Sequence, residues 1–188
     1  MNLKRCVWCN MKNPLNVKYH DEEWGQPRFD DAYLFEMLLL ESFQAGLSWE
    51  CVLNKRENFW KAFDGFDVEK IAAYDVVKLE SLTNDAGIIR NKLKIKAAVN
   101  NAKIFLSIQG EYGSFLNYLN QFWNGETIYE TELTHSELSD TVSANLCKRG
   151  MKFMGTTIVY SYLQAIGIIN SHDENCFLHK NTKIISRT

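Results

Sequence analysis

Apolar residues recur at every third or fourth position along almost the whole of this 188-residue chain, which is the period of an amphipathic α-helix. Only 2 Pro and 10 Gly interrupt the pattern, too few for the many tight turns of a β-sandwich or β-barrel. The clearest segment, AYLFEMLLLESF, follows the N-cap candidates Asp30 and Asp31 and stops near Gly46. The sequence therefore predicts an all-α fold.

Capping residues and glycines set the limits of the other expected helices. Ser48 is a good N-cap for one helix over residues 49–63, which Asp64 and Gly65 would end. The stretch 6–20 shows no clear helical period, and the polar stretch 124–139 is the best candidate for a loop. Further helices are expected over residues 68–73, 76–84, 93–109, 112–123, 140–149 and 156–166.

Length and composition indicate one domain that spans residues 1–188. No internal repeat or Pro-rich linker divides the chain, and 46% of its residues are hydrophobic, enough for a sizeable core. No run of 18 apolar residues would cross a membrane, and the N-terminus lacks the apolar region of a secretory signal. Five scattered cysteines do not suit a secreted disulfide framework, and no heptad seam calls for a second subunit. We therefore expect a monomer in the reducing cytoplasm.

The charge of the chain is unevenly distributed, although its net value is only −2. Residues 86–110 contain no Asp or Glu, and residues 141–172 contain none either. A basic patch attracts phosphates whatever the net charge, so nucleic acid is not excluded as a partner. Charge alone favours the plainer alternative, in which each run is a solvated helix face. The cations of the two windows are Arg90, Lys92, Lys94, Lys96 and Lys103, and then Lys148, Arg149 and Lys152.

The spacing of His172 and Cys176 places an imidazole and a thiol on one face of a helical turn, where both could bind one metal ion. A structural zinc site needs four nitrogen or sulfur ligands. Cys6 and His20 could supply the other two and would join the two ends of the chain. The CxxC pair of Cys6 and Cys9 is a rival that could bind metal or act in redox chemistry. Spacing also leaves open that these residues simply pack or face water.

Glu41 stands in an otherwise apolar helical stretch, just before the turn QAGLSW. A buried carboxylate needs hydrogen-bond donors or a cation, so Glu41 is either paired within the fold or waiting for a ligand. The turn presents Leu47 and Trp49 beside Gly46, as a wedge into stacked bases would require. In the plainer alternative, Leu47 and Trp49 fold back into the core at a helix corner.

Two further patterns are compatible with DNA binding. Trp8, Tyr19 and Trp24 could stack on a base, although aromatic residues more often belong to a core. Around residues 76–105, the stretch DAGIIRNKLK joins two expected helices and resembles a helix-hairpin-helix. In that motif the N–H groups of the hairpin and of the next helix meet a DNA phosphate. The DNA contacts predicted here are Gly87, Arg90, Lys92 and Lys94.

Together these segments resemble a known family. CVW, YHDEEWG, LFEMLLLESFQAGLSW, KREN, DAGIIRNK, KRGMKFMGTT and the closing His-x₃-Cys occur in the order found in 3-methyladenine DNA glycosylase I. The resemblance covers nearly the whole chain, apart from the tail after Cys176 and the loop 126–140. It implies a base-excision repair enzyme of the helix-hairpin-helix superfamily. Such an enzyme flips 3-methyladenine out of alkylated double-stranded DNA, hydrolyses its N-glycosidic bond and releases the free base.

The resemblance also implies roles for individual residues. Glu41 would be the catalytic carboxylate that holds the base, while Gly46 and Leu47 would enter the duplex near the lesion. Four residues would bind one structural Zn²⁺, remote from the chemistry, and three aromatic residues would wall the base pocket. The zinc ligands would be Cys6, His20, His172 and Cys176, and the aromatic walls Trp8, Tyr19 and Trp49.

Two other classes of function stay open. Many members of the superfamily use an Asp after the hairpin, and residues 86–110 contain none. A module that binds damaged DNA without cleaving it is therefore one alternative. The other is a redox centre at CVWC on a helical scaffold, with no role in DNA chemistry. It predicts that Cys9 is essential, whereas the family resemblance predicts that Cys9 is dispensable.

Overall fold

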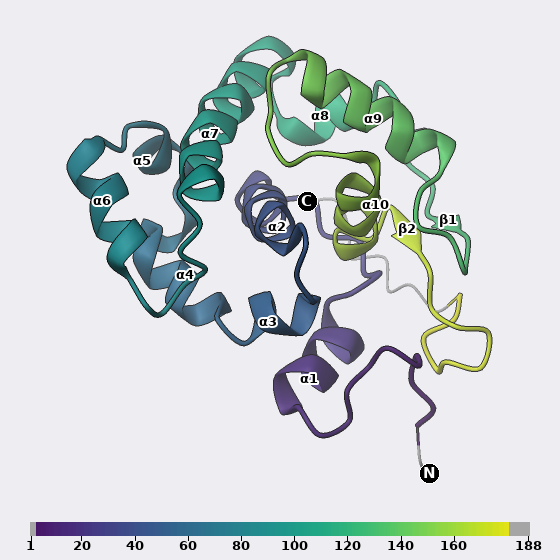
Figure 1. Ribbon diagram of the computed structural model, residues 1–188. Helices are drawn as coiled ribbons and strands as arrows, with labels where there is room; N and C mark the ends of the chain where they lie inside the picture. Colours follow the sequence, from purple (N-terminus) through teal and green to yellow (C-terminus); the bar gives the residue numbers. More distant parts are fainter. Residues whose placement is uncertain (1–2, 181–188) are drawn as a thin grey trace.

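A computed structural model describes residues 3–180, in which helices are the dominant secondary structure (Figure 1). Within this part of the chain, one pair of two-residue strands runs parallel, with Ile128 opposite Ile169. The expectation of an all-α fold is confirmed apart from this pair. The helices are α1 (Pro14–Glu22), α2 (Asp31–Gln44), α3 (Trp49–Leu53), α4 (Arg56–Ala62), the 3₁₀ turn η1 (Asp64–Phe66), α5 (Val68–Ala72), α6 (Val76–Asn84), α7 (Lys92–Tyr112), α8 (Phe115–Leu119), α9 (Glu137–Lys148) and α10 (Thr156–Ala165), and the strands are β1 (Ile128–Tyr129) and β2 (Ile169–Asn170).

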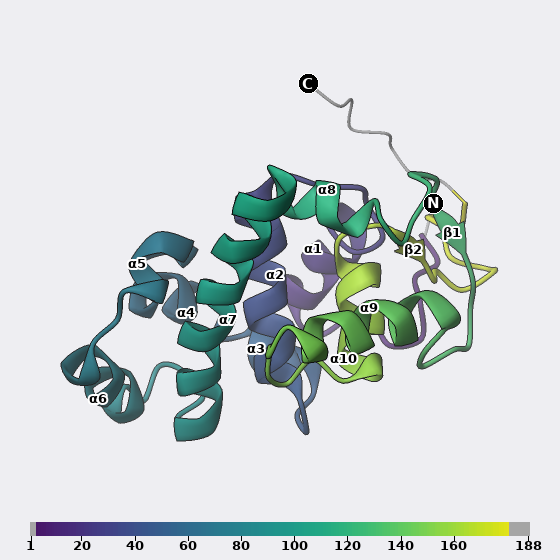
Figure 2. The same cartoon turned by 90° about the horizontal axis from the view of Figure 1, so that it is seen from above.

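Helix α2 lies at the centre of the molecule (Figures 1 and 2). From Tyr33 to Phe43 every side chain except that of Glu36 is buried, so the helix is enclosed on all sides rather than along one stripe. Helices α7 and α10 pack against it, and α3 follows its C-terminal end. Because such a helix is stable only inside a shell of other helices, α2 determines where its neighbours lie.

The remaining helices form groups on either side of this centre. Helices α4, α5 and α6 lie on the far side of α7, whereas α9 packs on α10 near the two strands (Figure 2). Helix α1 packs against α3. The first and last described segments also meet, because the N–H of Phe177 donates to the carbonyl oxygen of Lys4 at 2.9 Å. Residues far apart in sequence are thereby brought to one end of α2.

Residues 49–63 form two helices, α3 and α4, so the expectation of one continuous helix is wrong. The chain bends after Asn54, which caps the end of α3. The bend directs Arg56 between two carboxylates, with N–O distances of 2.7 Å to Glu23 and 2.7 Å to Glu36. These partly buried ion pairs come from other segments of the chain, so the helical period of 49–63 could not reveal the bend.

Helix α1 lies where no helical period was visible, because its buried residues, Asn16, Tyr19 and His20, do not form an apolar stripe. Its start is nevertheless marked in the sequence. Asn13 accepts a hydrogen bond as the N-cap, and Pro14 follows at a position where a missing N–H is tolerated. The signal for this helix was therefore the cap and not the hydrophobic pattern.

The other boundaries agree with the expected ones to within a few residues, except for α7, α8 and α9. Helix α7 passes Gly110 and ends where Gly113 takes the left-handed conformation. Helix α8 is confined to five residues. Helix α9 starts at Glu137, where Ser139 Oγ accepts a hydrogen bond from the N–H of the N-cap residue Ser136 at 2.8 Å. Even α7, with 21 residues the longest, is too polar to cross a membrane, and no other helix in residues 3–180 meets that requirement.

Gly167, just after α10, takes a conformation that strains any other residue, with φ of +78°. A Cβ at this position would lie 2.3 Å from backbone atoms of Gln26 and Pro27. We expect Gly167→Ala to cost on the order of 3 kcal/mol of stability and to lower Tm by roughly 10 °C in thermal unfolding.

The matched control for this variant is Gly110→Ala inside α7. A Cβ there meets no atom of another segment within 4 Å, so the helix should gain slightly in stability. Similar Tm values for the two variants would contradict the close approach at Gly167.

Candidate active site

Four side chains from the two ends of the described chain converge in the interior. Cys6, His20, His172 and Cys176 are all buried, and their donor atoms lie within 4.8 Å of one another. Cys6 Sγ is 3.3 Å from His172 Nδ1, and Cys176 Sγ is 3.5 Å from both His172 Nδ1 and His20 Nε2. Ligands bound at about 2.0–2.3 Å to a tetrahedral zinc are roughly 3.3–3.8 Å apart. The donor set and its spacing fit a zinc ion.

The outer nitrogen of each imidazole has an acceptor, which leaves the inner nitrogen facing the cluster. His20 Nδ1 lies 2.8 Å from Asp21 Oδ1, and His172 Nε2 lies 3.1 Å from the carbonyl oxygen of Trp24. Partners of this kind fix the ring orientation of metal-binding histidines. The second layer of contacts around the cluster is therefore also of the type that metal sites use.

Burial shapes the charge of this cluster. It raises the pKa of the Cys6 thiol and lowers the pKa of His172 to about 4. Without a cation these groups are therefore neutral near pH 7, and paired thiolates need a cation beside them. The N–H groups of Asp173 and Leu178 donate to Cys6 Sγ and Cys176 Sγ at 3.4 and 3.5 Å, as they would to thiolate ligands.

Cys9 stands outside this group of four, although it completes the CVWC motif. It is buried, and both Cys6 and Cys9 are free thiols. The sulfur of Cys6 contacts His172 instead. The partner of Cys6 Sγ is thus His172, whereas a CxxC redox centre would require Cys9.

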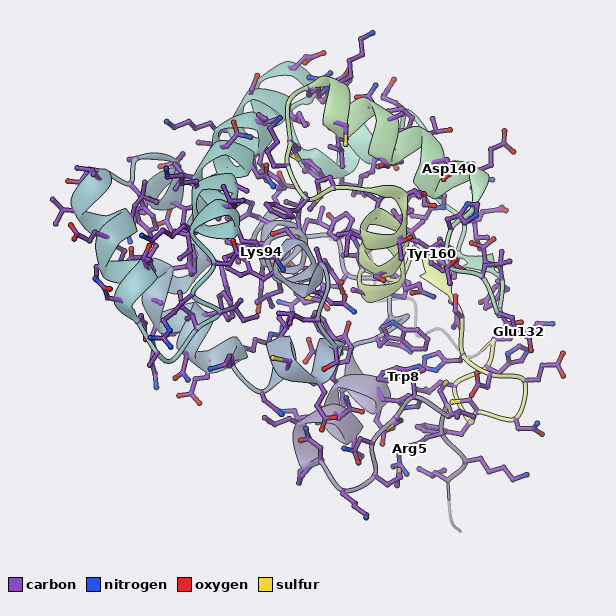
Figure 3. All side chains as sticks on the ribbon, viewed as in Figure 1. Arg5, Trp8, Lys94, Glu132, Asp140 and Tyr160 are labelled. Carbon is purple, nitrogen blue, oxygen red and sulfur yellow. The ribbon has the colours of Figure 1, made fainter. Side chains whose placement is uncertain are left out.

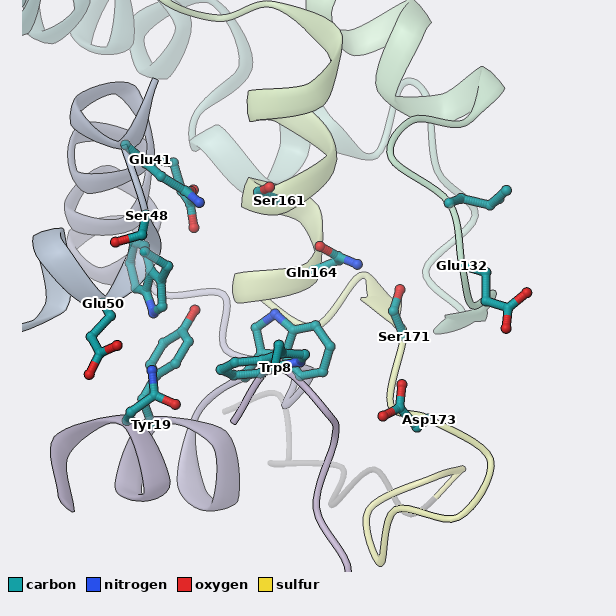
Figure 4. A pocket seen from close by; sticks show the side chains of 15 residues that line it. Trp8, Tyr19, Glu41, Ser48, Glu50, Glu132, Ser161, Gln164, Ser171 and Asp173 are labelled. Atoms are coloured by element: carbon teal, nitrogen blue, oxygen red, sulfur yellow. The ribbon is translucent and has the colours of Figure 1, made fainter. Parts of the chain in front are cut away.

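A cavity of about 490 Å³ opens between α1, α2, α3 and α10 (Figure 4). Its volume is in the range of small-molecule sites. The four residues predicted to bind a base, Trp8, Tyr19, Glu41 and Trp49, all line this cavity. The fold thus brings together residues that lie more than forty positions apart in the sequence.

Glu41 projects from α2 into this cavity. Its side chain is only 2% exposed, and its Oε2 atom has no hydrogen-bond partner among residues 3–180. Burial raises the pKa of its carboxyl well above the usual range. Since no donor or cation of the described chain pairs with Glu41, the structure favours a carboxyl that awaits a ligand over one that is paired within the fold.

Aromatic rings line the same cavity as Glu41. The centroids of Tyr19 and Trp49 are 4.9 Å apart, and Trp8 meets Trp24 edge-on at 4.8 Å. Trp8 is 38% exposed at the outside of the cavity, whereas Tyr19 is buried. Burial, and then the charge of Glu41, raise the pKa of Tyr19 well above its usual value, so the hydroxyl stays protonated. Rings placed in this way can stack on a flat ligand and favour a cationic one.

Two more polar atoms of the cavity lining lack partners. Trp49 Nε1 and Gln44 Oε1 are buried without a hydrogen bond among the described residues. Gln44 lies three residues after Glu41 and hence on the same face of α2. Unsatisfied buried donors and acceptors cost free energy in the empty protein. A planar ligand with both amine and ring-nitrogen groups could satisfy them.

The turn after α2 presents Leu47 beside the cavity, between Gln44 and Ser48, which both line it. Gly46 has φ of +77° and no other segment within 4 Å of its Cβ position, so the chain turns outward there. Leu47 is 43% exposed. The prediction of a projecting apolar residue agrees with the structure at Leu47, whereas Trp49 turns back into the cavity wall.

The expected hairpin connects α6 to α7 through residues 85–91. The N–H of Gly87 donates to Asp85 Oδ1 at 2.7 Å, so this donor is already used within the hairpin. Arg90 and Lys92 are exposed. Their side chains, rather than the N–H of Gly87, are the groups that the hairpin offers to an anion.

Lys94 is not a surface cation, which corrects the expectation that it contacts DNA. It is 5% exposed, and its Nζ donates to the carbonyl oxygens of Phe43 and Ala45 at 2.7 and 2.5 Å. Figure 3 places it between α7 and α2. Two residues away on either side, Lys92 and Lys96 remain exposed. Within this run of lysines, Lys94 alone is buried and donates to backbone carbonyl oxygens.

Sequence patterns did not identify several residues of the cavity. Ser161 and Gln164 of α10 lie across it from Glu41 (Figure 4). Asp173 enters from the segment after β2, and Glu132 from the loop after β1. The only signal for Ser161 and Gln164 was that they are polar residues three positions apart in a largely apolar helix. For Asp173 and Glu132 no local signal existed.

The chain is similar to known proteins along nearly all of its length. The family model described as methyladenine glycosylase matches residues 8–179. DNA-3-methyladenine glycosylase 1 of Escherichia coli (strain K12) is 42% identical over 187 residues, covering 96% of this chain and 100% of that protein. DNA-3-methyladenine glycosylase of Haemophilus influenzae is 36% identical over 178 residues, covering 92% and 96%.

Solved structures agree with the fold. A crystal structure of 3-methyladenine DNA glycosylase I has a TM-score of 0.90 at 42% identity and covers 94% of this chain and 100% of its own. A Staphylococcus aureus structure that describes 3-methyladenine recognition by the same kind of enzyme has a TM-score of 0.89 at 33% identity. It covers 94% of this chain and 97% of its own.

The raised pKa of Glu41 makes the stability of the protein depend on pH. Below about pH 4.3, the usual pKa of glutamate, the side chain is protonated in both the folded and the unfolded chain. Above that pH the unfolded chain loses the proton first, so the folded state loses stability until the pH passes its own, higher pKa.

We therefore expect Glu41→Gln to raise Tm above that of the parent protein by more at pH 8 than at pH 5. Each kcal/mol corresponds to roughly 3 °C for a chain of this size. The control is Glu57→Gln, an exposed residue paired with Lys61, which should give no such gain. A Tm difference that is the same at both pH values would contradict the unpaired burial of Glu41.

Proposed function

The chain belongs to the methyladenine glycosylase family, and on this premise we propose that its cavity holds 3-methyladenine flipped out of alkylated duplex DNA, with Glu41 as the catalytic carboxylate. As a member of that family it is a base-excision repair hydrolase that cleaves the N-glycosidic bond of 3-methyladenine. The observation that carries the residue assignment is the buried, unpartnered carboxyl of Glu41 among aromatic rings.

Recognition follows from the charge of the damaged base. Methylation at N3 makes the base cationic while it is attached to deoxyribose. As it enters, its charge lowers the pKa of Glu41 and favours the carboxylate, which accepts hydrogen bonds from the exocyclic amine and the edge of the base. Stacking on Tyr19 and Trp49 adds roughly 1–2 kcal/mol for a cationic base when water is excluded. Unmodified adenine lacks the charge, so the pocket disfavours it.

Cleavage replaces the bond between C1′ of deoxyribose and the base nitrogen by a bond between C1′ and the oxygen of water. The electron pair of the broken bond stays on the base, which leaves as neutral 3-methyladenine, and a proton of the water passes to solvent. Because the base is a good leaving group, modest acceleration suffices. The carboxylate of Glu41 stabilises the positive charge that develops beside it. The lack of Asp and Glu in residues 86–110 is consistent with this mechanism.

Access to the base requires that it leave the duplex, which costs a few kcal/mol in lost stacking and pairing. Leu47 stands beside the cavity, and its exposed side chain can fill the gap that the flipped base leaves. Gly46 gives the turn its outward direction. Arg90 and Lys92, the exposed cations that follow the hairpin glycine, are assigned to DNA phosphates.

We assign the cluster of Cys6, His20, His172 and Cys176 to one structural Zn²⁺. All four positions would be filled by protein, so the ion would take no part in the reaction. Its effect would be to fix the pocket walls, since Trp8 lies two residues after Cys6 and Tyr19 directly precedes His20. The support is the convergence of four buried donors with spacings of 3.3–3.5 Å.

The two other classes of function receive less support. The relatives that this chain matches are glycosylases, which favours catalysis over binding of damaged DNA without cleavage. A redox centre would need Cys6 to pair with Cys9, but Cys6 Sγ contacts His172.

The function is tested by chromatography of the bases freed from methylated duplex DNA. We expect release of 3-methyladenine and not of 7-methylguanine. Glu41→Gln should slow release by about 10- to 100-fold, the value of one hydrogen bond to a charged group, and should change DNA affinity far less. Glu57→Gln is the control. Release by Glu41→Gln at the parent rate would remove Glu41 from the mechanism.

The zinc assignment is tested by metal analysis and thermal unfolding. Cys176→Ser should bind far less than one zinc per chain and unfold at a lower temperature, because a closed four-ligand site contributes directly to stability. Cys9→Ser should keep its zinc and its activity. Loss of activity in Cys9→Ser at full zinc content would instead support the redox alternative.

A further inference from the structure

The buried ammonium group of Lys94 lies where three segments meet. It donates to Phe43 and Ala45 at the end of α2, and it lies 5.8 Å from the ring centre of Phe153, in the segment between α9 and α10. Among residues 3–180 no carboxylate pairs with it. Burying a cation without a carboxylate partner costs free energy, so the two carbonyl oxygens that accept from Lys94 must offset that cost.

These two carbonyl groups can stabilise a cation because they lie at the C-terminal end of α2. The last carbonyl groups of a helix have no partner within the helix, and they carry partial negative charge. The C-cap residue of α2, Ala45, makes no capping hydrogen bond through its own N–H. Lys94, a residue of α7, therefore acts as the cap of α2. The cap also ties α2 to the helix that begins at the hairpin.

We propose that Lys94 is a positioning residue, which holds the Gly46–Leu47 turn at the cavity so that Leu47 can enter the duplex. Phe43 and Ala45 directly precede this turn, and Gly46 itself touches no other segment within 4 Å of its Cβ position. Within the turn, the N–H of Leu47 donates to the carbonyl oxygen of Gln44 at 2.6 Å, and the two contacts of Lys94 hold the carbonyl groups on either side of Gln44. The proposal rests on the proposed function of the cavity, and it gives Lys94 a role distinct from that of the exposed Lys92.

The test compares Lys94→Met with Lys92→Met, the same change on the exposed side of α7. Lys94→Met should slow excision from methylated duplex DNA by about tenfold or more, because small misplacements of a positioned group are that costly. Its affinity for free 3-methyladenine and the salt dependence of DNA binding should match the parent. Lys92→Met should reduce the slope of log affinity against log salt concentration by about 1. Unchanged duplex excision in Lys94→Met, or a reduced salt slope, would overturn the proposal.

A double-mutant cycle shows whether Lys94 acts through Leu47. If it does, adding Lys94→Met to Leu47→Ala should slow excision by less than the change does alone, since both remove the same function. Losses that simply multiply would overturn the proposal. If Lys94→Met does not fold, Lys94→Gln, whose side chain is shorter and uncharged, takes its place in the cycle.

Amide hydrogen exchange separates this proposal from the proposed function. Exchange over residues 44–48 should be faster in Lys94→Met and unchanged in Lys92→Met, because only the former loses the cap. If the parent protein freed no 3-methyladenine, the proposed function would fail. Unchanged exchange over 44–48 in Lys94→Met would overturn the Lys94 proposal alone.

Discussion

The complete burial of α2 is the constraint on which the rest of the structure depends. A helix that is apolar on every side must be enclosed, so α7, α10 and α3 are arranged around it. The same burial makes Glu41 chemically unusual, because its carboxyl is almost inaccessible to solvent and its Oε2 atom has no partner among the described residues. The polar character of the cavity wall thus depends on where the chain places one acidic residue within its central helix. Burying this carboxyl without a partner costs free energy, and a ligand that forms a hydrogen bond with it removes that cost.

The walls of the cavity depend on the two ends of the chain. Trp8 and Tyr19 adjoin Cys6 and His20, and these meet His172 and Cys176 at distances that suit one metal ion. The N-terminal segment contributes few large apolar side chains to the core before α1, so hydrophobic packing alone holds it weakly. A bound ion would supply that attachment at the point where the pocket needs rigid aromatic rings. The residues that bind the ion and those that wall the pocket would then be neighbours in the chain, without the ion entering the chemistry.

Most of the fold could be predicted from sequence, because helix caps and apolar periods are local properties. The cap at Asp30, the end of α10 at Gly167 and the order of the helices follow from such signals. The break between α3 and α4 could not be predicted, because the ion pairs of Arg56 beside it are made with carboxylates of two other segments. In the site, Trp8, Tyr19, Glu41 and Trp49 were found through their pattern and family resemblance. Asp173 and Glu132 were not, since nothing in their neighbours marks a cavity.

The sequence by itself determined that this chain is helical and where most of its helices start and end, and its resemblance to the methyladenine glycosylase family supplied the candidate residues of the site. Only the tertiary structure decided that Lys92 faces solvent while Lys94 caps α2. It also decided that the N–H of Gly87 is bound by Asp85. The physical reason is that a helical period shows which residues share a face, but not which neighbour that face meets. The energy of a charge depends on that neighbour, because the same ammonium group is solvated on one side of α7 and desolvated on the other.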